Sequence, residues 1–300
     1  MTAHFYGTRY LLAPVLDLGD EKVAHFEAAF ATALERGGVP VLEPGEGHAA
    51  HELLRFLVER KGLLARGTNA PGVDVFEPQE AVDYFGNPVK AVFAAEDGLW
   101  PMFFAIINGE NPGLRVLWNA CKWGRSDAGD VQRLYAFALN REALAGTPFV
   151  PGSVYLLPDD GFRRIAGADG LPTAERVCEA PVRPLAQVPV SPGDFPFLDE
   201  VQTFDLNALR AMREVPQGAS AYAEHADGYT LAFDLRRTPM ERIRLMVQFG
   251  QEFYPGWQAE TAERSASEVW VRFRFPTGAI AFAKAELREI LPPLDSLRRL

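Results

Sequence analysis

The residues best placed to do chemistry in this sequence follow a short apolar run. Residues 63–65 are predicted to form a strand, and Arg66, Gly67 and Thr68 come directly after it. An arginine at a strand end can present its planar guanidinium to a phosphate or carboxylate. Gly67 lets the backbone approach a ligand closely, because glycine has no side chain. The pattern favours a binding site; the alternative is a surface arginine beside a tight turn.

The elements that must position this site lie within residues 61–108. A turn-rich loop over 69–72 follows the first strand, and a second turn over 84–88 leads into an apolar strand over 89–95. An aromatic helix is predicted over 99–107, with Asp97 as its N-terminal cap. We therefore expect two strands and one helix around the site.

The flanking regions contain helices before this stretch and strands after it. Apolar residues spaced three and four apart predict a helix from Asp20 to the stop at Gly37 and Gly38, and a second helix over 48–60. Further predicted elements are an extended segment over 10–18, strands over 116–120, 134–139, 152–158 and 162–165, and a helix over 199–213.

The end of the chain has a different organisation. The composition loosens at 216–220, which we interpret as a domain boundary. The predicted order after it is a strand over 229–235, a helix over 239–254, strands over 257–262 and 269–275, and a helix over 277–290. The predicted fold class is α+β: residues 1–215 form a helical N-terminal segment with a central β-rich domain of mixed or antiparallel strands, and residues 221–300 form a small β-α-β-β-α domain.

Composition restricts the classes of partner. The sequence has 30 Lys and Arg against 40 Asp and Glu, a net charge of -10 without a basic stripe, which disfavours nucleic acid. No apolar run reaches the roughly 18 residues of a membrane span, and the N-terminus lacks a signal-peptide pattern. Only two cysteines occur, as expected for a reducing compartment. We expect a cytoplasmic protein whose partner is a small-molecule or protein substrate.

Other candidate groups each have a structural alternative that we favour. His48 and His51 share a helix face with Glu52, but a metal site would need a further ligand, so we predict a solvated helix start and no metal. Cys121 is followed by Lys122, which could activate a thiol, yet a buried core residue fits better.

Aromatic and acidic clusters are also ambiguous. The aromatic set could line a pocket for a planar ligand or form core: Trp100, Phe103, Phe104, Trp118 and Trp123. The acidic pairs at strand ends could hold a divalent cation or cap turns and helices: Glu96 with Asp97, and Asp159 with Asp160. We favour the structural interpretation for both sets.

The order of these elements over residues 60–190 resembles the ADP-ribosyltransferase-like superfamily, including its RNA 2′-phosphotransferase branch. The resemblance is carried by Arg66-Gly67-Thr68 after the first strand, by Phe85-Gly86, by the strand around Val92-Phe93-Ala94 with its aromatic helix, and by the later strand around Val154-Tyr155-Leu156. The sequence departs from the family in lacking a histidine in the first motif and a Ser-Thr-Ser strand.

The resemblance implies a transferase that uses NAD as a substrate. It implies that Arg66 and Gly67 bind the nicotinamide side of NAD and that Thr68 supports the strand end. An aromatic ring for stacking would come from Tyr84, Phe85 or Phe93.

The acid of the third motif corresponds to Glu175 or Glu179, of which Glu179 is preferred because a strand-like run follows it. A carboxylate there would stabilise the oxocarbenium-like centre as nicotinamide leaves. The alternative is a non-catalytic binding or scaffold protein. Convergence of Arg66, an aromatic ring and one of the two acids in one cleft would favour the enzyme.

Overall fold

The chain forms two units, each with its own core. A computed structural model describes residues 2–5, 8–82, 88–125, 131–166, 172–253, 257–275, 291–293 and 297–299. The first unit comprises Leu12–Phe137 and Glu142–Val201, and the second comprises Thr2–Leu11, Ala138–Arg141 and Gln202–Leu300. The division near Gln202 falls before the loosened segment at 216–220, where a short turn over Pro216–Gly218 leads into a strand.

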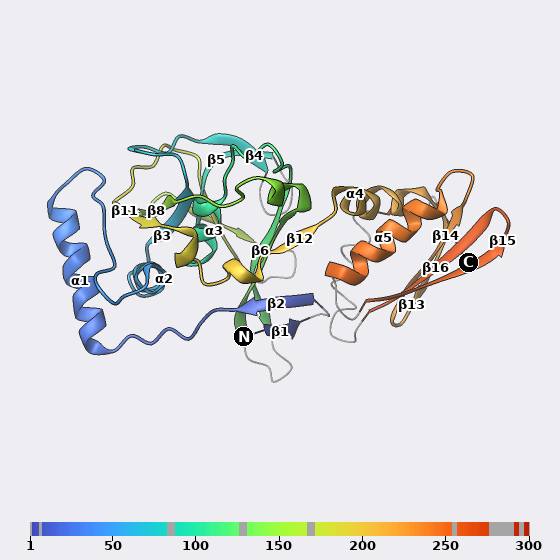
Figure 1. Cartoon of the computed structure of the whole chain (residues 1–300), viewed down its shortest axis with the longest axis horizontal. Coiled ribbons are helices and arrows are strands. Elements are labelled where there is room, and N and C mark those ends of the chain that lie inside the picture. Colours follow the sequence, from blue (N-terminus) through green and yellow to red (C-terminus); the bar gives the residue numbers. More distant parts are fainter. Residues whose placement is uncertain are drawn as a thin grey trace. The chain divides into compact units, whose positions relative to one another are not determined.

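The first unit contains helices and antiparallel strands (Figure 1). Its helices are α1 (Asp20–Glu35), α2 (Ala50–Arg55) with a π-helical turn over Phe56–Arg60, and α3 (Trp100–Ile106), with 3-10 turns at Arg141–Ala145, Pro192–Asp194 and Leu198–Glu200. Its strands are β3 (Leu64–Thr68), β4 (Gln79–Val82), β5 (Pro88–Ala95), β6 (Leu117–Arg125), β8 (Gly152–Leu157), β9 (Arg163–Ala166), β10 (Pro172–Cys178) and β11 (Ala186–Val190), and β7 (Val131–Asn140) continues into the second unit.

The site region is organised by one antiparallel path of strands. Neighbouring strands follow the order β6-β10-β5-β3-β8-β11, with β4 added to β5 and β9 added to β10. Helix α3 packs against β3 and β8. Strand β10 was not predicted from the sequence, although it pairs with β5, β6 and β9. The apolar run 73–76 contributes one isolated bridge, between Phe76 and Val182.

A single buried carboxylate fixes the start of α3. Asp97 is fully buried, and one of its oxygens accepts hydrogen bonds from the amides of Leu99 (2.9 Å) and Trp100 (2.6 Å). The other oxygen accepts from Arg133 and from the Tyr135 hydroxyl, both at 2.7 Å. The N-cap of α3 is Leu99, so Asp97 is not the cap that the sequence predicted; it binds the first amides of the helix from two residues earlier and joins the helix to β7.

The second unit contains a separate sheet of five strands. Its elements are β1 (Thr2–Phe5), β2 (Thr8–Leu12), β12 (Gln202–Phe204), α4 (Leu206–Glu214), β13 (Ala219–His225), β14 (Gly228–Asp234), α5 (Met240–Phe253), β15 (Gln258–Ser265), β16 (Glu268–Arg274) and β17 (Arg298–Arg299). The sheet order is β15-β16-β14-β13-β17, and the strands β1, β2 and β12 of this unit do not belong to it. The predicted succession of strand, helix and two strands corresponds to β14, α5, β15 and β16, whereas the helix predicted over 277–290 lies outside the described residues.

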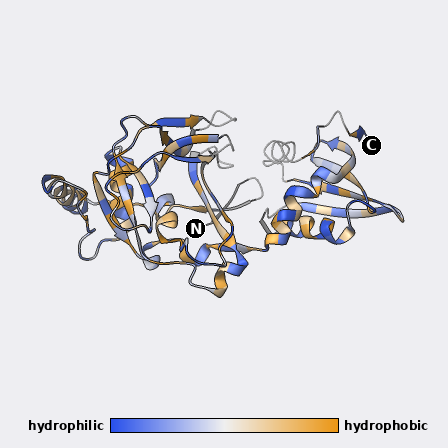
Figure 2. Ribbon diagram, turned by 90° about the horizontal axis from the view of Figure 1, so that it is seen from above, coloured by the Kyte–Doolittle hydropathy of each residue, from blue (hydrophilic) through white to orange (hydrophobic). Residues whose placement is uncertain are grey.

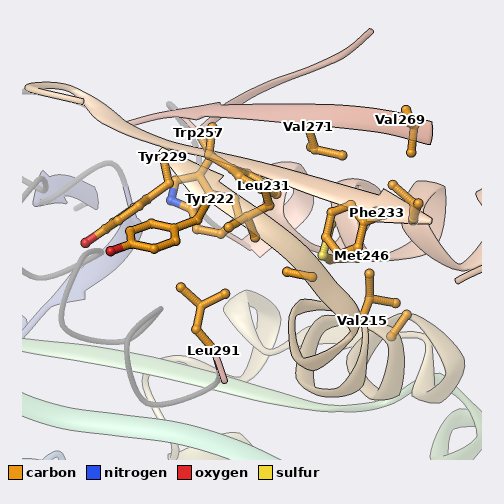
Figure 3. Close-up of a cluster of buried hydrophobic side chains, with 14 of the residues drawn as sticks. Val215, Tyr222, Tyr229, Leu231, Phe233, Met246, Trp257, Val269, Val271 and Leu291 are labelled. Atoms are coloured by element: carbon orange, nitrogen blue, oxygen red, sulfur yellow. The ribbon is translucent and has the colours of Figure 1, made fainter. Parts of the chain in front are cut away.

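Alternation of polar and apolar residues explains this second core. Strands and helices of both units carry hydrophilic and hydrophobic residues along the same element (Figure 2). On β14 and β16, every second residue faces the helices, so Tyr229, Leu231, Val269 and Val271 are buried together. Figure 3 shows these side chains between the strands and the helices, with Met246 contributed by α5. The fold class is α+β, as predicted.

None of the helices within the described ranges combines the length and the apolar character that a membrane span requires.

We expect replacement of Asp97 by alanine to destabilise the chain strongly. The substitution leaves the buried Arg133 and Tyr135 without their acceptor, and breaking a buried ion pair costs about 3–5 kcal/mol. Urea unfolding of Asp97→Ala measures the loss. Asp160→Ala, at an exposed turn, is the control and should stay within about 0.5 kcal/mol of the parent protein. Equal losses in the two variants would contradict the assigned role of Asp97.

Candidate functional site

Most of the predicted site residues that the structure describes surround one cavity of about 330 Å³, which we call the α3 pocket. Its walls come from α3 and from strands β3, β4, β5 and β10. The lining residues are Ala65, Arg66, Gly67, Gln79, Ala81, Ala91, Phe93, Ala94, Ala95, Trp100, Pro101, Phe104 and Glu175.

Strand register brings Glu175 into this pocket. Ala95 of β5 is opposite Ala65 of β3 on one side and opposite Glu175 of β10 on the other. Residues directly opposite one another in antiparallel strands share a face of the sheet. The carboxylate of Glu175 therefore lies on the same face as Ala65 and Ala95, the face against which α3 packs.

Arg66 occupies the point where β3 and β5 separate. The β3–β5 ladder consists of the single pair Ala65 and Ala95, and beyond it the Nη1 of Arg66 donates a hydrogen bond to the Phe93 carbonyl at 2.7 Å. The guanidinium also lies 4.9 Å from the centre of the Phe76 ring. Burial lowers the pKa of Arg66, and no carboxylate among the described residues pairs with it. Its buried Nε has no hydrogen-bond partner there either.

Gly67 and Thr68 have structural roles at the end of β3. A Cβ at position 67 would collide with the Pro101 carbonyl oxygen and lie 2.7 Å from the Ala105 amide nitrogen. The close approach expected for a ligand is thus made by the backbone of α3. The Thr68 hydroxyl accepts a hydrogen bond from the Ala70 amide at 3.1 Å, which supports the turn after the strand.

The aromatic wall of the pocket comes from β5 and α3. Phe93 lies in the pocket, as predicted, and it is joined by Trp100 and Phe104, whose ring centres are 5.7 Å apart in an edge-on arrangement. Phe103, on the other side of α3, is fully buried against Phe137. The other two predicted stacking candidates, Tyr84 and Phe85, lie outside the described residues.

The two candidate acids have different surroundings. Glu175 lines the α3 pocket. Glu179, the preferred acid, lies after β10, is 70 % exposed, and pairs with Arg163 at 3.6 Å. Glu179 does not line the α3 pocket, because the chain has left the sheet before reaching it. Of the two acids, the structure brings only Glu175 together with Arg66 and an aromatic ring.

A second, larger cavity of about 780 Å³ lies in the first unit, and we call it the arginine pocket. Its polar lining consists of Arg55, Glu59, Glu96, Gln132, Arg133, Tyr135, Asp159, Arg164 and Arg176. Arg176 follows Glu175 on β10 and therefore points to the opposite face of the sheet. The two pockets share no lining residue.

Ion pairs order the arginine pocket. Glu96 accepts from both Arg164 and Arg176 at 3.1 Å, and Arg176 also pairs with Asp159. Arg133 binds Asp97 and lies 4.4 Å from the centre of the Trp123 ring. Burial is the largest single effect on Arg133 and would lower its pKa, but the charges of Asp97, Cys121 and Tyr135 and the hydrogen bond to Asp97 together raise the pKa above its ordinary value.

The remaining candidate groups are packed into the fold. His48 lies against the rings of His25 and Phe26, with centroid distances of 4.9 and 5.4 Å, which differs from the solvated helix start that we predicted. Burial lowers the pKa of His51. Cys121 is fully buried, and burial followed by the neighbouring Asp97 charge raises the pKa of its thiol well above the ordinary value. Its environment is that of a core residue.

Within the described residues, there is no group of three or more His, Cys, Asp or Glu side chains that could hold a metal ion.

No protein-family model matches the chain, and comparisons with curated proteins and with solved structures found no match.

Sequence reasoning missed most of the arginine pocket. Arg133, Arg164 and Arg176 stand on three different strands, and each is isolated in the sequence from the acid that it meets. Such groups converge only through strand pairing, so no local motif identifies them. Trp100 and Phe104 belong to the aromatic set for which we favoured a role in the core, whereas both line the α3 pocket.

We expect Gly67→Ala to reduce the stability of the protein by several kcal/mol, because the new Cβ would meet the backbone of α3, which cannot move without repacking the helix. Gly109→Ala is the matched control, since a Cβ there has no atom within 4 Å. Thermal unfolding followed by circular dichroism compares the two. If Gly67→Ala melts at the parental temperature, the glycine is not required for helix packing.

Proposed function

We propose that the chain is an ADP-ribosyltransferase-like enzyme that binds NAD in the α3 pocket and uses Glu175 as its catalytic carboxylate. The observation that carries the proposal is that Glu175, Arg66 and an aromatic wall all line one cavity, although the Arg66 guanidinium is turned toward Phe76, which does not line it. These groups come from β10, β3, β5 and α3, elements that are distant in the sequence. A strand end with a surface arginine would not require such a convergence.

The aromatic wall suits the nicotinamide of NAD. In NAD the nicotinamide is an N-glycosylated pyridinium, which is planar and positively charged. Aromatic faces attract cations at distances within about 6 Å, and tryptophan does so best. Trp100 and Phe104 supply rings, and Phe104 is 37 % exposed, so it is accessible to a ligand.

The charges of the pocket suit the rest of the molecule. Arg66 is a half-buried cation with no carboxylate partner in the described part of the chain, and even partial burial of an uncompensated charge is unfavourable. The diphosphate of NAD is an anion that would compensate it. Because Nη1 is already bonded to Phe93, we assign Arg66 to charge compensation and to holding β5 in place.

Glu175 is positioned for the chemical step. The bond between the nicotinamide nitrogen and the ribose C1′ breaks, and its electron pair leaves with nicotinamide, which becomes neutral. The ribose then carries oxocarbenium character, and a nearby carboxylate stabilises that developing positive charge. An oxygen or nitrogen nucleophile of the acceptor forms the new bond to C1′ and loses a proton. With water as the acceptor, the products are nicotinamide and ADP-ribose.

We expect Glu175→Gln to lower the rate of nicotinamide release from NAD by about 10²–10³-fold, the range found when one transition-state electrostatic contact is removed. The affinity for NAD should change much less, because the carboxylate acts mainly on the transition state. Release is followed by chromatography, and binding by isothermal titration calorimetry.

Glu179→Gln is the matched control for this experiment. It removes the same charge four positions later at a site that is exposed and outside the pocket, so its rate should stay within about twofold of the parent. A larger loss from Glu179→Gln than from Glu175→Gln would contradict the assignment of the acid. Absence of both binding and nicotinamide release in the parent protein would reject the proposed function.

We also expect Phe104→Ala to weaken NAD binding by about two- to thirtyfold, the equivalent of about 0.5–2 kcal/mol for a cation–π contact. The ring is 37 % exposed, so the fold should tolerate its removal. Leu144→Ala truncates a 52 % exposed side chain outside the pocket and should leave affinity unchanged. Calorimetric titration of the two variants with NAD makes the comparison. Equal affinities would place the nicotinamide elsewhere.

A non-catalytic binding protein is the second candidate. It is favoured by the structural roles of Arg66 and Gly67, which hold β5 and seat α3 without any ligand. In this case the parent protein would neither bind NAD nor release nicotinamide, and Glu175→Gln would behave like the parent. The same pair of measurements therefore separates the two candidates.

A further inference from the structure

We propose that the arginine pocket is a second ligand site, which binds a small organic phosphomonoester through Arg164 and Arg176 in place of Asp159. The proposal is independent of the function assigned to the α3 pocket, because the two cavities share no lining residue. At about 780 Å³ the cavity has the size of ordinary small-molecule sites.

The pocket is a built site whose cationic groups are already oriented. The Arg176 side chain is nine-tenths buried, and Glu96 holds both it and Arg164 at 3.1 Å. Together with Arg133, these side chains come from β10, β9 and β7. A preorganised guanidinium loses little conformational freedom when it binds an anion.

Asp159 occupies the position on Arg176 where the ligand anion would bind. It pairs with the terminal nitrogen Nη2 of Arg176 and is 51 % exposed, so it can rotate into solvent at little cost. Surface ion pairs contribute only about 0–1 kcal/mol, and the buried Arg176 keeps Glu96 as a partner when Asp159 leaves. A ligand dianion carries more charge than Asp159 and can replace it on the same nitrogen.

Phosphate fits this set of donors better than a carboxylate does. Three arginines from three different strands line the cavity, as many as the outer oxygens of a phosphomonoester. A carboxylate offers one oxygen fewer and carries a single charge. At pH 8 a phosphomonoester is a dianion, because its second pKa lies near about 6.

The apolar part of the cavity wall indicates that the ligand carries an organic group as well as a phosphate. A phosphate group fills only a small part of a cavity of this size. Leu12, Leu63, Leu64 and Trp123 line the rest, and apolar surface of this kind gains from contact with a carbon skeleton. An ester should therefore bind more tightly than inorganic phosphate.

The test compares two neighbouring pairs of residues by calorimetric titration with phenyl phosphate at pH 8. Arg164→Ala removes a pocket side chain that is 60 % exposed, and Arg163→Ala removes its chain neighbour, 57 % exposed, which does not line the cavity. We expect Arg164→Ala to weaken binding at least about tenfold, as for loss of a hydrogen bond to a charged group, and Arg163→Ala to change it less than twofold.

The second pair tests the displaced acid. Asp159→Asn removes the competing charge and should tighten binding of phenyl phosphate about three- to tenfold, whereas Asp160→Asn, an exposed neighbour outside the cavity, should leave it unchanged. All four replaced side chains are exposed, so unaltered melting curves will show that the fold is intact. Titration of Arg164→Ala with NAD should match the parent, because the α3 pocket is separate.

Specific results would overturn the proposal. Equal losses in Arg163→Ala and Arg164→Ala would show attraction by general surface charge. No binding of phenyl phosphate to either the parent protein or Asp159→Asn would reject the site. If inorganic phosphate binds as tightly as phenyl phosphate, the proposal of a phosphomonoester ligand is wrong, and the pocket is assigned to free phosphate.

Discussion

The buried carboxylate of Asp97 is the constraint on which both pockets depend. One of its oxygens holds the first amides of α3, and the other holds Arg133 and the Tyr135 hydroxyl of β7. The first contact sets the position of Trp100 and, through the helix, of Phe104. The second sets Arg133 in the arginine pocket. A buried charge is tolerated only with partners of this quality, since an unpaired carboxylate would cost far more than each bond contributes. The same charge raises the pKa of Tyr135, after the larger effect of burial, so the hydroxyl remains a hydrogen-bond donor.

Alternation along β10 explains how two chemically different cavities form on one small sheet. Glu175 is opposite Ala95 and faces α3, whereas Arg176 is opposite Ala94 and faces the other side. Adjacent residues of a strand point to opposite faces, so one strand supplies an acid to the α3 pocket and a cation to the arginine pocket. A shift of register by one residue would exchange them. The pairing of β10 with β5 therefore determines the charge of both sites, and mutations that disturb this ladder should affect both.

The sequence predicted those elements whose signals are local. Helix α1 followed from apolar residues spaced three and four apart, and α3 from Asp97 before an aromatic helix. Strand β10 gave no such signal, because its buried residues include Arg176, whose charge is compensated by Glu96, 80 positions earlier. That long-range pair permits a charged residue in a central strand. For the same reason, both Glu175 and Glu179 were candidates for the acid of the third motif, and Glu179 was preferred. Only the register of β10 shows that Glu175 is within the sheet and that Glu179 lies beyond its end.

The arginines of the first unit show why residue type alone does not identify a site. Arg55 and Arg176 are buried, Arg133 and Arg66 are half-buried, and all of these except Arg66 are paired with a carboxylate from the described chain. Among the described residues, Arg66 has a backbone carbonyl and an aromatic ring as partners, and neither carries a compensating charge. A partly buried cation in that state gains more from an anionic ligand than a paired one does, because the ligand supplies the missing charge without first displacing another. The structural bond to Phe93 and a role in binding are therefore compatible: the bond fixes the guanidinium, and its unpaired charge provides the attraction.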